Sequence, residues 1–245
     1  MIDMCCRDTV DNQPILFVET DRKRLAALGA LLIPHVPVDA PVSAAQTIDY
    51  ARHRTYRLAL VNVCATGVAT GLVMRLLSGR APRTPIVAIA SPRDLAALSA
   101  VGEGALDAVF GEPPPVPEIM AVLGRYVPAL RRRRWSRQVI AAVDDVCRHG
   151  VVTMSVQGLA DRIGASRNHL TALFQAQVGL GVREYLRGAA TVLASRLLLE
   201  SDAKLEDVAS EAGFCDASHL SRVFRRHMGI RPGAFRDREA EPAAG

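Results

Sequence analysis

The feature of this sequence that most constrains its fold is a stretch of about twenty residues that is written twice. Residues 159–179 read LADRIGASRNHLTALFQAQVG, and residues 208–229 read VASEAGFCDASHLSRVFRRHMG. Each copy has a short helical pattern, a Gly (Gly164 or Gly213) at a turn, a capping side chain (Ser166 or Asp216) and a second helical pattern. This order is typical of a helix-turn-helix. The repeat therefore predicts two helix-turn-helix units in one chain.

The second helix of each copy is expected to have a buried face and an exposed face. The apolar residues at helical spacing, expected in the core, are Leu170, Leu173 and Phe174 in the first copy and Leu220, Val223 and Phe224 in the second. An exposed helix that begins with small and hydrogen-bonding residues fits a major groove, where Arg reads guanine and Asn reads adenine. Helix pairs with polar outer faces are also common in any all-α domain. The outward residues are Arg167, Asn168, Thr171, Ala172, Ala217, Ser218, Ser221 and Arg222.

The charge of the chain favours the nucleic-acid interpretation. Basic and acidic residues balance up to residue 130, so the net charge of +5 lies entirely in the second half, with the repeat. A basic surface attracts polyanions. The run RRRR at 131–134 adds little by itself, because such runs are usually solvated helix faces.

The first half of the chain has a different pattern. Short apolar runs alternate with helical patterns, which predicts a parallel sheet with helices on both faces, an α/β doubly wound fold. HVPV at 35–38 is a doubtful fifth strand because Pro37 cannot donate to a ladder. The expected strands are 15–18, 56–63, 85–90 and 105–110, and the expected helices are 21–33, 43–54, 69–79, 92–101 and 117–130.

Beyond residue 130 only helices are expected. Residues 131–150 read as a connecting helix with one apolar stripe, which serves packing within a domain or pairing of two chains equally well. Everything from Met154 onward reads as helix and turn. We therefore expect an α/β domain over 1–130, a connecting helix and linker over 131–153, and an all-α domain with two helix-turn-helix motifs over 154–245.

Residues 154–238 resemble the DNA-binding domain of AraC/XylS-type transcription regulators. The resemblance rests on both copies, on the middle stretch RLLLESDAKLEDVASEAGF, and on the ending G-x-x-P-x-x-[FY]-R, here GIRPGAFR. It implies two recognition helices, joined by a helix over about 183–200, that enter successive major-groove segments of double-stranded DNA. RNA polymerase is then a candidate partner, and a homodimer is the expected assembly.

The resemblance also implies roles for individual residues. The base-reading candidates are Arg167, Asn168, Thr171, Ala217, Ser218, Ser221 and Arg222. Arg222 is the strongest of these and Arg167 the next, whereas Ser166, Arg225, Arg226 and Arg231 are expected to hold phosphates. Two residues depart from the family pattern. The family usually carries Arg near Ala190 and often a long polar side chain at Ala172, so the first motif is expected to contribute less specificity.

The first domain resembles a response-regulator receiver, a flavodoxin-like fold, but lacks the chemistry of one. A working receiver needs paired acids for Mg²⁺, an Asp nucleophile, a Ser or Thr, and a Lys. Here Glu19 precedes Thr20, the acceptor position is Asn62, and the hydroxyl position is Ala90, with Ser91 beside it leaving the register open. The only lysines are Lys23 and Lys204, so Gly111 and Glu112 stand where the Lys is expected. We expect a receiver-like domain that is not phosphorylated on aspartate.

Three functions stay open for such a domain: dimerisation or protein interaction, binding of a small-molecule effector in the strand-end crevice, or a folded spacer without regulation. An enzyme that uses Cys64 with His53 or His35 is a distant alternative, because nothing in the spacing places either imidazole beside the thiol.

Composition excludes several other classes. The five cysteines form no CxxC and suggest a reduced cytoplasm rather than a disulfide framework. Cys215 and His219 lie one helical turn apart, but no second pair completes a metal site. The acidic start argues against export, and the charge-free stretch 58–74 reads as strand, turn and helix rather than as a membrane span. No cofactor, metal or membrane partner is expected.

Overall fold

The computed structural model describes residues 13–66, 69–79, 83–94, 98, 105–130 and 135–240. Contacts divide the chain into two compact units. The first unit runs up to Thr20 and resumes over Val36–Ile119, and the second combines Asp21–His35 with the chain from Met120 onward. The expected division at residue 130 is a single cut along the chain. The contact-based division differs from it because the helix that follows the first strand belongs to the helical unit. Each unit is described by itself.

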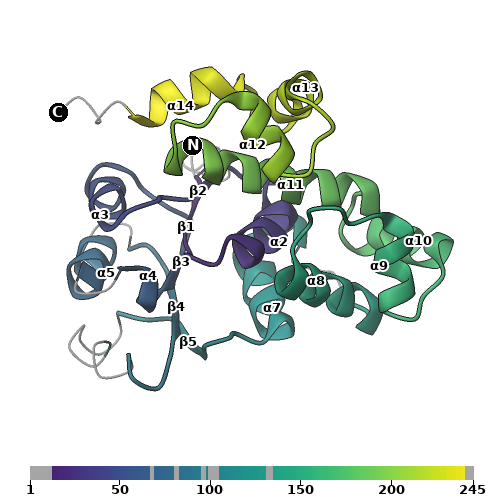
Figure 1. Ribbon diagram of the computed structural model, residues 1–245. Coiled ribbons are helices and arrows are strands. Elements are labelled where there is room, and N and C mark those ends of the chain that lie inside the picture. Colours follow the sequence, from purple (N-terminus) through teal and green to yellow (C-terminus); the bar gives the residue numbers. More distant parts are fainter. Residues whose placement is uncertain are drawn as a thin grey trace, which may run out of the picture. The chain divides into compact units, whose positions relative to one another are not determined.

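The first unit is built on a parallel five-stranded sheet in the order β2-β1-β3-β4-β5 (Figure 1). The α/β class expected from the alternating pattern is therefore confirmed for this unit. The doubtful strand is a two-residue edge strand that begins just after Pro37, whose carbonyl accepts a hydrogen bond from Ile15 N at 2.9 Å. The strands are β1 (Ile15–Val18), β2 (Val38–Asp39), β3 (Leu58–Asn62), β4 (Ile86–Ala90) and β5 (Ala108–Gly111).

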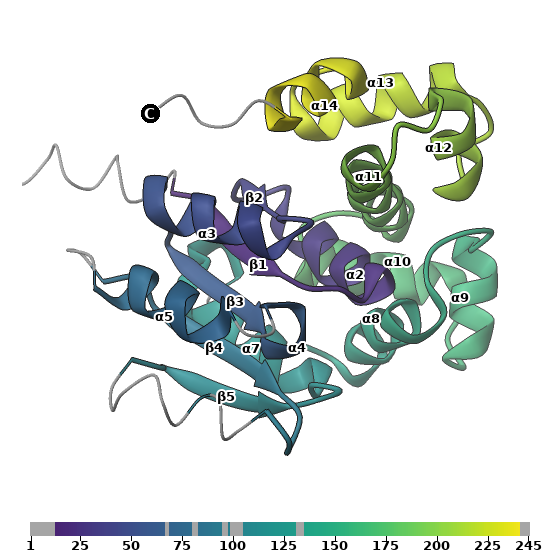
Figure 2. The same ribbon diagram turned by 60° about the vertical axis from the view of Figure 1, so that its left-hand side comes forward.

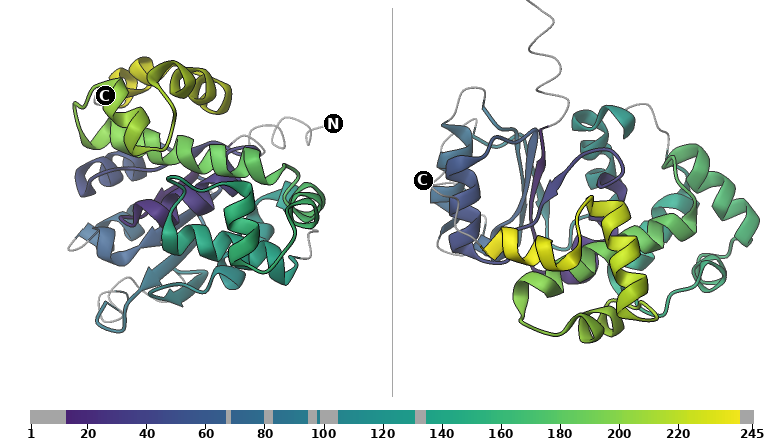
Figure 3. Two further views of the ribbon diagram at one scale, coloured as in Figure 1. Left: turned by 45° about the vertical axis from the view of Figure 1, so that its right-hand side comes forward. Right: turned by 90° about the horizontal axis from the view of Figure 1, so that it is seen from above.

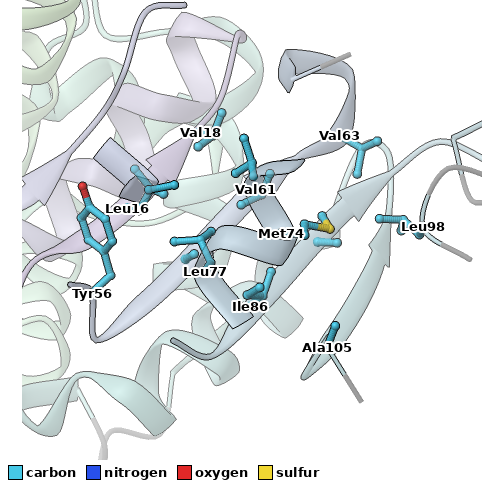
Figure 4. Packing of buried hydrophobic residues seen from close by; sticks show 14 of the residues in the cluster. Leu16, Val18, Tyr56, Val61, Val63, Met74, Leu77, Ile86, Leu98 and Ala105 are labelled. Carbon is cyan, nitrogen blue, oxygen red and sulfur yellow. The ribbon is translucent and has the colours of Figure 1, made fainter. Parts of the chain in front are cut away.

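Helices α3 (Ala44–His53), α4 (Val63–Thr66) and α5 (Thr70–Ser78) complete the described part of this unit, and α7 begins in it (Figure 2). On the face of the sheet that α5 covers, the core consists of alternate strand residues, among them Leu16, Val61 and Ile86, which pack with Met74 and Leu77 of α5 (Figure 4). The period of two along a strand brings these residues to one face. The charge-free stretch 58–74 thus forms a strand followed by helices, and most of the helix expected over 92–101 lies outside the described residues.

The second unit is helical. Its helices are α2 (Arg22–Leu32), most of α7 (Val116–Tyr126), a 3-10 turn (Pro128–Leu130), α8 (Arg137–His149), α9 (Val156–Arg162), α10 (Arg167–Gln177), α11 (Val182–Glu200), α12 (Leu205–Glu211), α13 (Ala217–Met228) and α14 (Pro232–Ala240). The helix that joins the two motifs was expected over about 183–200 and is confirmed as α11. Figure 3 shows α11 as the long helix beside which the C-terminal helices lie. None of the helices in the described part of the chain is long and apolar enough to cross a membrane.

Helix α2 packs closely against α11 and α8. The hydroxyl of Tyr185, which is fully buried on α11, donates to the carbonyl of Ala27 at 3.1 Å. Gly29 and Gly188 lie at the contact, and a Cβ at Gly29 would approach Val192 to 3.2 Å. Small residues at these positions let the two helices approach each other, so α2 forms part of the core that supports α11.

Candidate nucleic-acid interface and strand-end cluster

The two helix-turn-helix motifs have the same backbone hydrogen bonds. After α9, Gly164 N donates to Asp161 O and Ala165 N to Ala160 O. After α12, Gly213 N donates to Ser210 O and Phe214 N to Ala209 O, which is the same pattern 49 residues later. Gly164 has φ of +66° and Gly213 has φ of +83°, a region that favours glycine. The expectation that these glycines make the sharp turns is confirmed.

Each recognition helix begins at a side-chain cap. Ser166 Oγ accepts from His169 N at 3.2 Å at the start of α10, and Asp216 Oδ1 accepts from His219 N at 2.7 Å at the start of α13. A cap of this kind satisfies a backbone N–H that has no partner within the helix. Ser166 was expected to hold a phosphate, and its oxygen is already engaged in the cap.

The buried and exposed faces of both recognition helices agree with the helical spacing. Leu170, Phe174, Leu220 and Phe224 are fully buried, Val223 is nearly so, and Leu173 is partly exposed. The outward residues of the first motif, Arg167, Asn168, Thr171 and Ala172, are all exposed. In the second motif Ser218 and Arg222 are exposed, and Ala217 and Ser221 are half-buried.

Arg167 and Arg222 differ from Thr171 in how free their side chains are. Thr171 Oγ1 donates to the carbonyl of Arg167 at 2.8 Å, so its hydroxyl hydrogen is used within α10. Neither guanidinium group forms a hydrogen bond or an ion pair with the described residues. Both are therefore available to an external acceptor.

The residues expected to hold phosphates are Arg225, Arg226 and Arg231, and all three are exposed. Arg226 lies 3.5 Å from Glu184 Oε1, so part of its charge is offset, whereas Arg225 and Arg231 have no such partner among the described residues. An exposed ion pair of this length contributes little to stability and leaves the Arg able to change partners.

The Arg that ends the family-like tail has a structural position. Arg236 donates through Nε to Leu198 O at 3.1 Å and through Nη2 to Ala203 O at 2.8 Å. Phe235 beside it packs edge-on against Phe224, with ring centroids 5.4 Å apart. Sequence reasoning identified this ending without a role, and the structure shows that it fastens α14 to the end of α11 and to α13.

The first unit brings Glu19, Asn62 and Glu112 together at the carboxyl ends of its strands. The amide nitrogen of Asn62 donates to Glu19 Oε1 at 3.0 Å and to Glu112 Oε2 at 2.9 Å. Glu19 Oε1 also accepts from Thr20 N at 2.8 Å. Glu19 and Asn62 are buried. One amide nitrogen therefore bridges two carboxyl groups, and one of them belongs to Glu112, which the resemblance had placed where a Lys is expected.

Ala90, the third residue of the expected pocket, is buried at the end of β4 and pairs with Gly111. The hydroxyl of Ser91 donates to Asp94, and the thiol of Cys64 donates to the same carboxylate oxygen at 3.1 Å. The hydrogen bond to Asp94 raises the pKa of Cys64, which disfavours the reactive thiolate. His53, named only in the distant enzyme alternative, contacts Asp49.

No cluster of three or more metal-ligating side chains occurs within the described ranges. Cys215 is exposed, and the ring of His219 packs edge-on against Phe214 with centroids 5.4 Å apart. The pair has no third or fourth ligand among these residues. Cys5 and Cys6 lie outside the described residues.

Comparison with known proteins places the similarity in the second unit. Residues 159–238 match the family described as a helix-turn-helix domain. A putative AraC-like transcription regulator of Streptomyces lividans is 40% identical over 88 residues, which cover 36% of this chain and 29% of that protein. The transcriptional activator NphR of a Rhodococcus species is 37% identical over 87 residues, which cover 36% of this chain and 26% of that protein.

A solved structure of the DNA-binding domain of AdpA, described as a global transcriptional factor in complex with a target DNA, is 29% identical. It covers 44% of this chain and 100% of that chain, with a TM-score of 0.40. The chain spans less than a third of the length of the AraC-like and NphR relatives. Residues 159–238, which match the helix-turn-helix family, lie in the second unit.

Proposed function

We propose that this chain is a sequence-specific DNA-binding transcription regulator of the AraC type. The observation that carries the proposal is the pair of helix-turn-helix motifs with matching turns and caps, each of which exposes a polar face on its second helix. The similarity of residues 159–238 to a helix-turn-helix family and to AraC-like regulators supports it.

Within this proposal, α10 and α13 each read one major-groove segment. Arg167 and Asn168 at the start of α10, and Ser218 and Arg222 on α13, are the exposed groups with donors for base edges. Thr171, Ala217 and Ser221 line the same faces and make shorter contacts. Arg225 and Arg231 neutralise phosphates and add affinity that carries no sequence information.

The test is selection from a pool of random-sequence duplexes with the full-length chain. We expect one enriched, asymmetric site with two elements about 34–36 Å apart along the duplex. Enrichment of a single element would contradict the proposal that both motifs read DNA, and absence of enrichment would contradict sequence-specific binding. In the same assay, Arg225→Gln should leave the enriched sequence unchanged and reduce the slope of log K against log salt by about 1.

For the first unit we propose a receiver-like domain that acts without aspartyl phosphorylation, as a dimerisation or protein-interaction module. The strand order 2-1-3-4-5 is one of the two common orders of doubly wound folds and supports the likeness. The bridged Glu19–Asn62–Glu112 cluster supports the loss of phosphorylation, because it contains no Asp nucleophile and no Lys.

Acetyl phosphate labelling tests the phosphorylation part, and sedimentation of the full chain tests dimerisation. The wild-type chain and Asn62→Asp should both stay unlabelled, since the substitution adds a third carboxylate and supplies no cation. Labelling of the variant would show that the cluster is a working pocket. A monomer at all concentrations up to the micromolar range would contradict the dimerisation role.

A further inference from the structure

A cavity of about 300 Å³ lies between the two helix-turn-helix motifs of the second unit. Its walls come from both motifs and from the first half of α11, so it lies where the two helix-turn-helix motifs meet. A volume of about 300 Å³ is at the lower end of the range for small-molecule sites.

Three arginines line this cavity: Arg167 on α10, and Arg183 and Arg187 on α11. The lining contains no Asp or Glu, and none of the three groups forms an ion pair or a hydrogen bond with the described residues. Elsewhere in this unit, Arg22 pairs with Glu200 and Arg162 with Asp145. The like charges around the cavity therefore lack the internal counter-charge that other arginines of the unit have.

The rest of the lining is largely apolar. Leu186, Ala190, Ala212 and Phe214 line the cavity and are buried. Ala190 has a small side chain, and a longer side chain at this position would occupy this space. An apolar wall beside uncompensated positive charge matches a ligand that has an apolar body and one acidic group.

We propose that this cavity binds a small organic anion, a carboxylate or phosphate carried on a ring or short apolar body. The acid meets Arg183 and Arg187, and the body lies against Leu186 and Phe214. Because Arg167 is also a base-reading candidate, a bound anion competes with DNA for it. The role of this cavity as an effector site therefore rests on the proposed DNA function, whereas binding of the anion to the chain alone does not.

The test uses phenyl phosphate as the probe, titrated into the full-length chain without DNA and followed by calorimetry and amide chemical shifts. We expect saturable binding at one site, with shifts at Leu186 and Phe214. Phenol tests the ring without the charge, and inorganic phosphate tests the charge without the ring. Each should bind at least about tenfold more weakly than phenyl phosphate, because each lacks one of the two sets of contacts. Equal binding of either would overturn the proposal.

Two variants test the location. Arg183→Gln with Arg187→Gln removes the charge, and Ala190→Leu fills the space while keeping the charge. Both should weaken phenyl phosphate binding by about tenfold or more, whereas Arg137→Gln with Arg148→Gln, which removes the same number of charges from α8, should not. Unchanged binding in either test variant, or an equal loss in the control, would overturn the proposal.

A DNA arm separates this inference from the proposed function. If the double variant weakens duplex binding while phenyl phosphate fails to bind the wild-type chain, the arginines hold a backbone phosphate and the small-anion proposal is wrong. Sequence-specific DNA binding would stand in that case. Conversely, a chain that binds phenyl phosphate in the cavity but enriches no DNA sequence would keep the anion site and refute the proposed function.

Discussion

The two helix-turn-helix motifs have the same backbone hydrogen bonds at their turns but differ in the contacts that hold their recognition helices in place. In the first motif, α10 packs on α8, and Gln177 Oε1 near its end accepts a hydrogen bond from Ser136 N at 2.7 Å. In the second, α13 packs on α14, and Arg236 ties that helix to the end of α11. The repeated residues thus set the motif, and residues outside the repeat supply its support. The comparison predicts different responses to equivalent substitutions.

Arg236→Ala should have the largest effect on stability and should act on the second motif. It leaves two backbone carbonyls without their charged donor, which costs about 2–4 kcal/mol of unfolding free energy. Urea unfolding of the full chain measures this, and hydrogen exchange should show that amides of α13 and α14 lose more protection than those of α10. Asp237→Ala, at an exposed position on the same helix, is the control and should change stability by less than about 0.5 kcal/mol. Equal loss of protection in both motifs would refute separate support.

Base reading should be stronger in the second motif than in the first. Arg222→Ala is expected to lower discrimination between the selected site and random duplex by about 1–3 kcal/mol, with preference lost at one end of the site. Arg167→Ala should act at the other end and by less. Competition binding at fixed salt gives both numbers, and a larger effect for Arg167→Ala would reverse the assignment of the stronger reader.

The turn glycines should differ in their tolerance of a side chain. Gly164→Ala and Gly213→Ala both place a Cβ at positive φ, which costs about 1–2 kcal/mol. A Cβ at Gly213 would also approach Val152 Cα to 3.3 Å, whereas nothing lies within 4 Å of one at Gly164. Gly213→Ala should therefore cost more in thermal unfolding. An equal loss of stability in the two variants would mean that the backbone at Val152 moves away from the new Cβ at no measurable cost.

The smallest predicted effect is a pH dependence confined to the second motif. His227 corresponds to Gln177, and burial lowers its pKa, as do the nearby charges of Arg226 and Arg187, while Glu184 opposes the shift. At pH values between the two pKa values of His227, the unfolded chain binds more protons than the folded one. The contribution of His227 to stability is therefore fully present above about pH 6.5 and is lost as the pH drops toward the folded pKa. His227→Gln, which copies the first motif, should flatten the difference between unfolding curves at pH 5 and pH 7.5. If the stability of the variant changed with pH as much as that of the wild type, the pH dependence would come from other groups.

Much of the local structure could be predicted from sequence because it depends on neighbours in the chain. The run ILFV forms β1 with the expected bounds, and α11 begins at Val182 and ends at Glu200, within one residue of expectation. The chain turns at Gly164 and Gly213, as the repeat predicted. The strand expected over 56–63 is β3, which ends at Asn62.

Other parts required distant segments to meet. The carboxylate of Glu112 reaches Asn62 across fifty residues, and the hydroxyl of Tyr185 reaches Ala27 across 158. No local sequence pattern distinguished Arg183 or Arg187, because an Arg on a helix is ordinary until a second helix brings Arg167 to the same cavity.

The sequence by itself determined that this chain has a parallel α/β part and a doubled helix-turn-helix part, because periodicity, turn glycines and caps act over a few residues. Only the tertiary structure decided that α2 belongs to the helical unit, that an amide joins two carboxylates at the strand ends, and that three arginines share one cavity. Those outcomes follow from packing and charge between residues far apart in the chain, which no local pattern encodes.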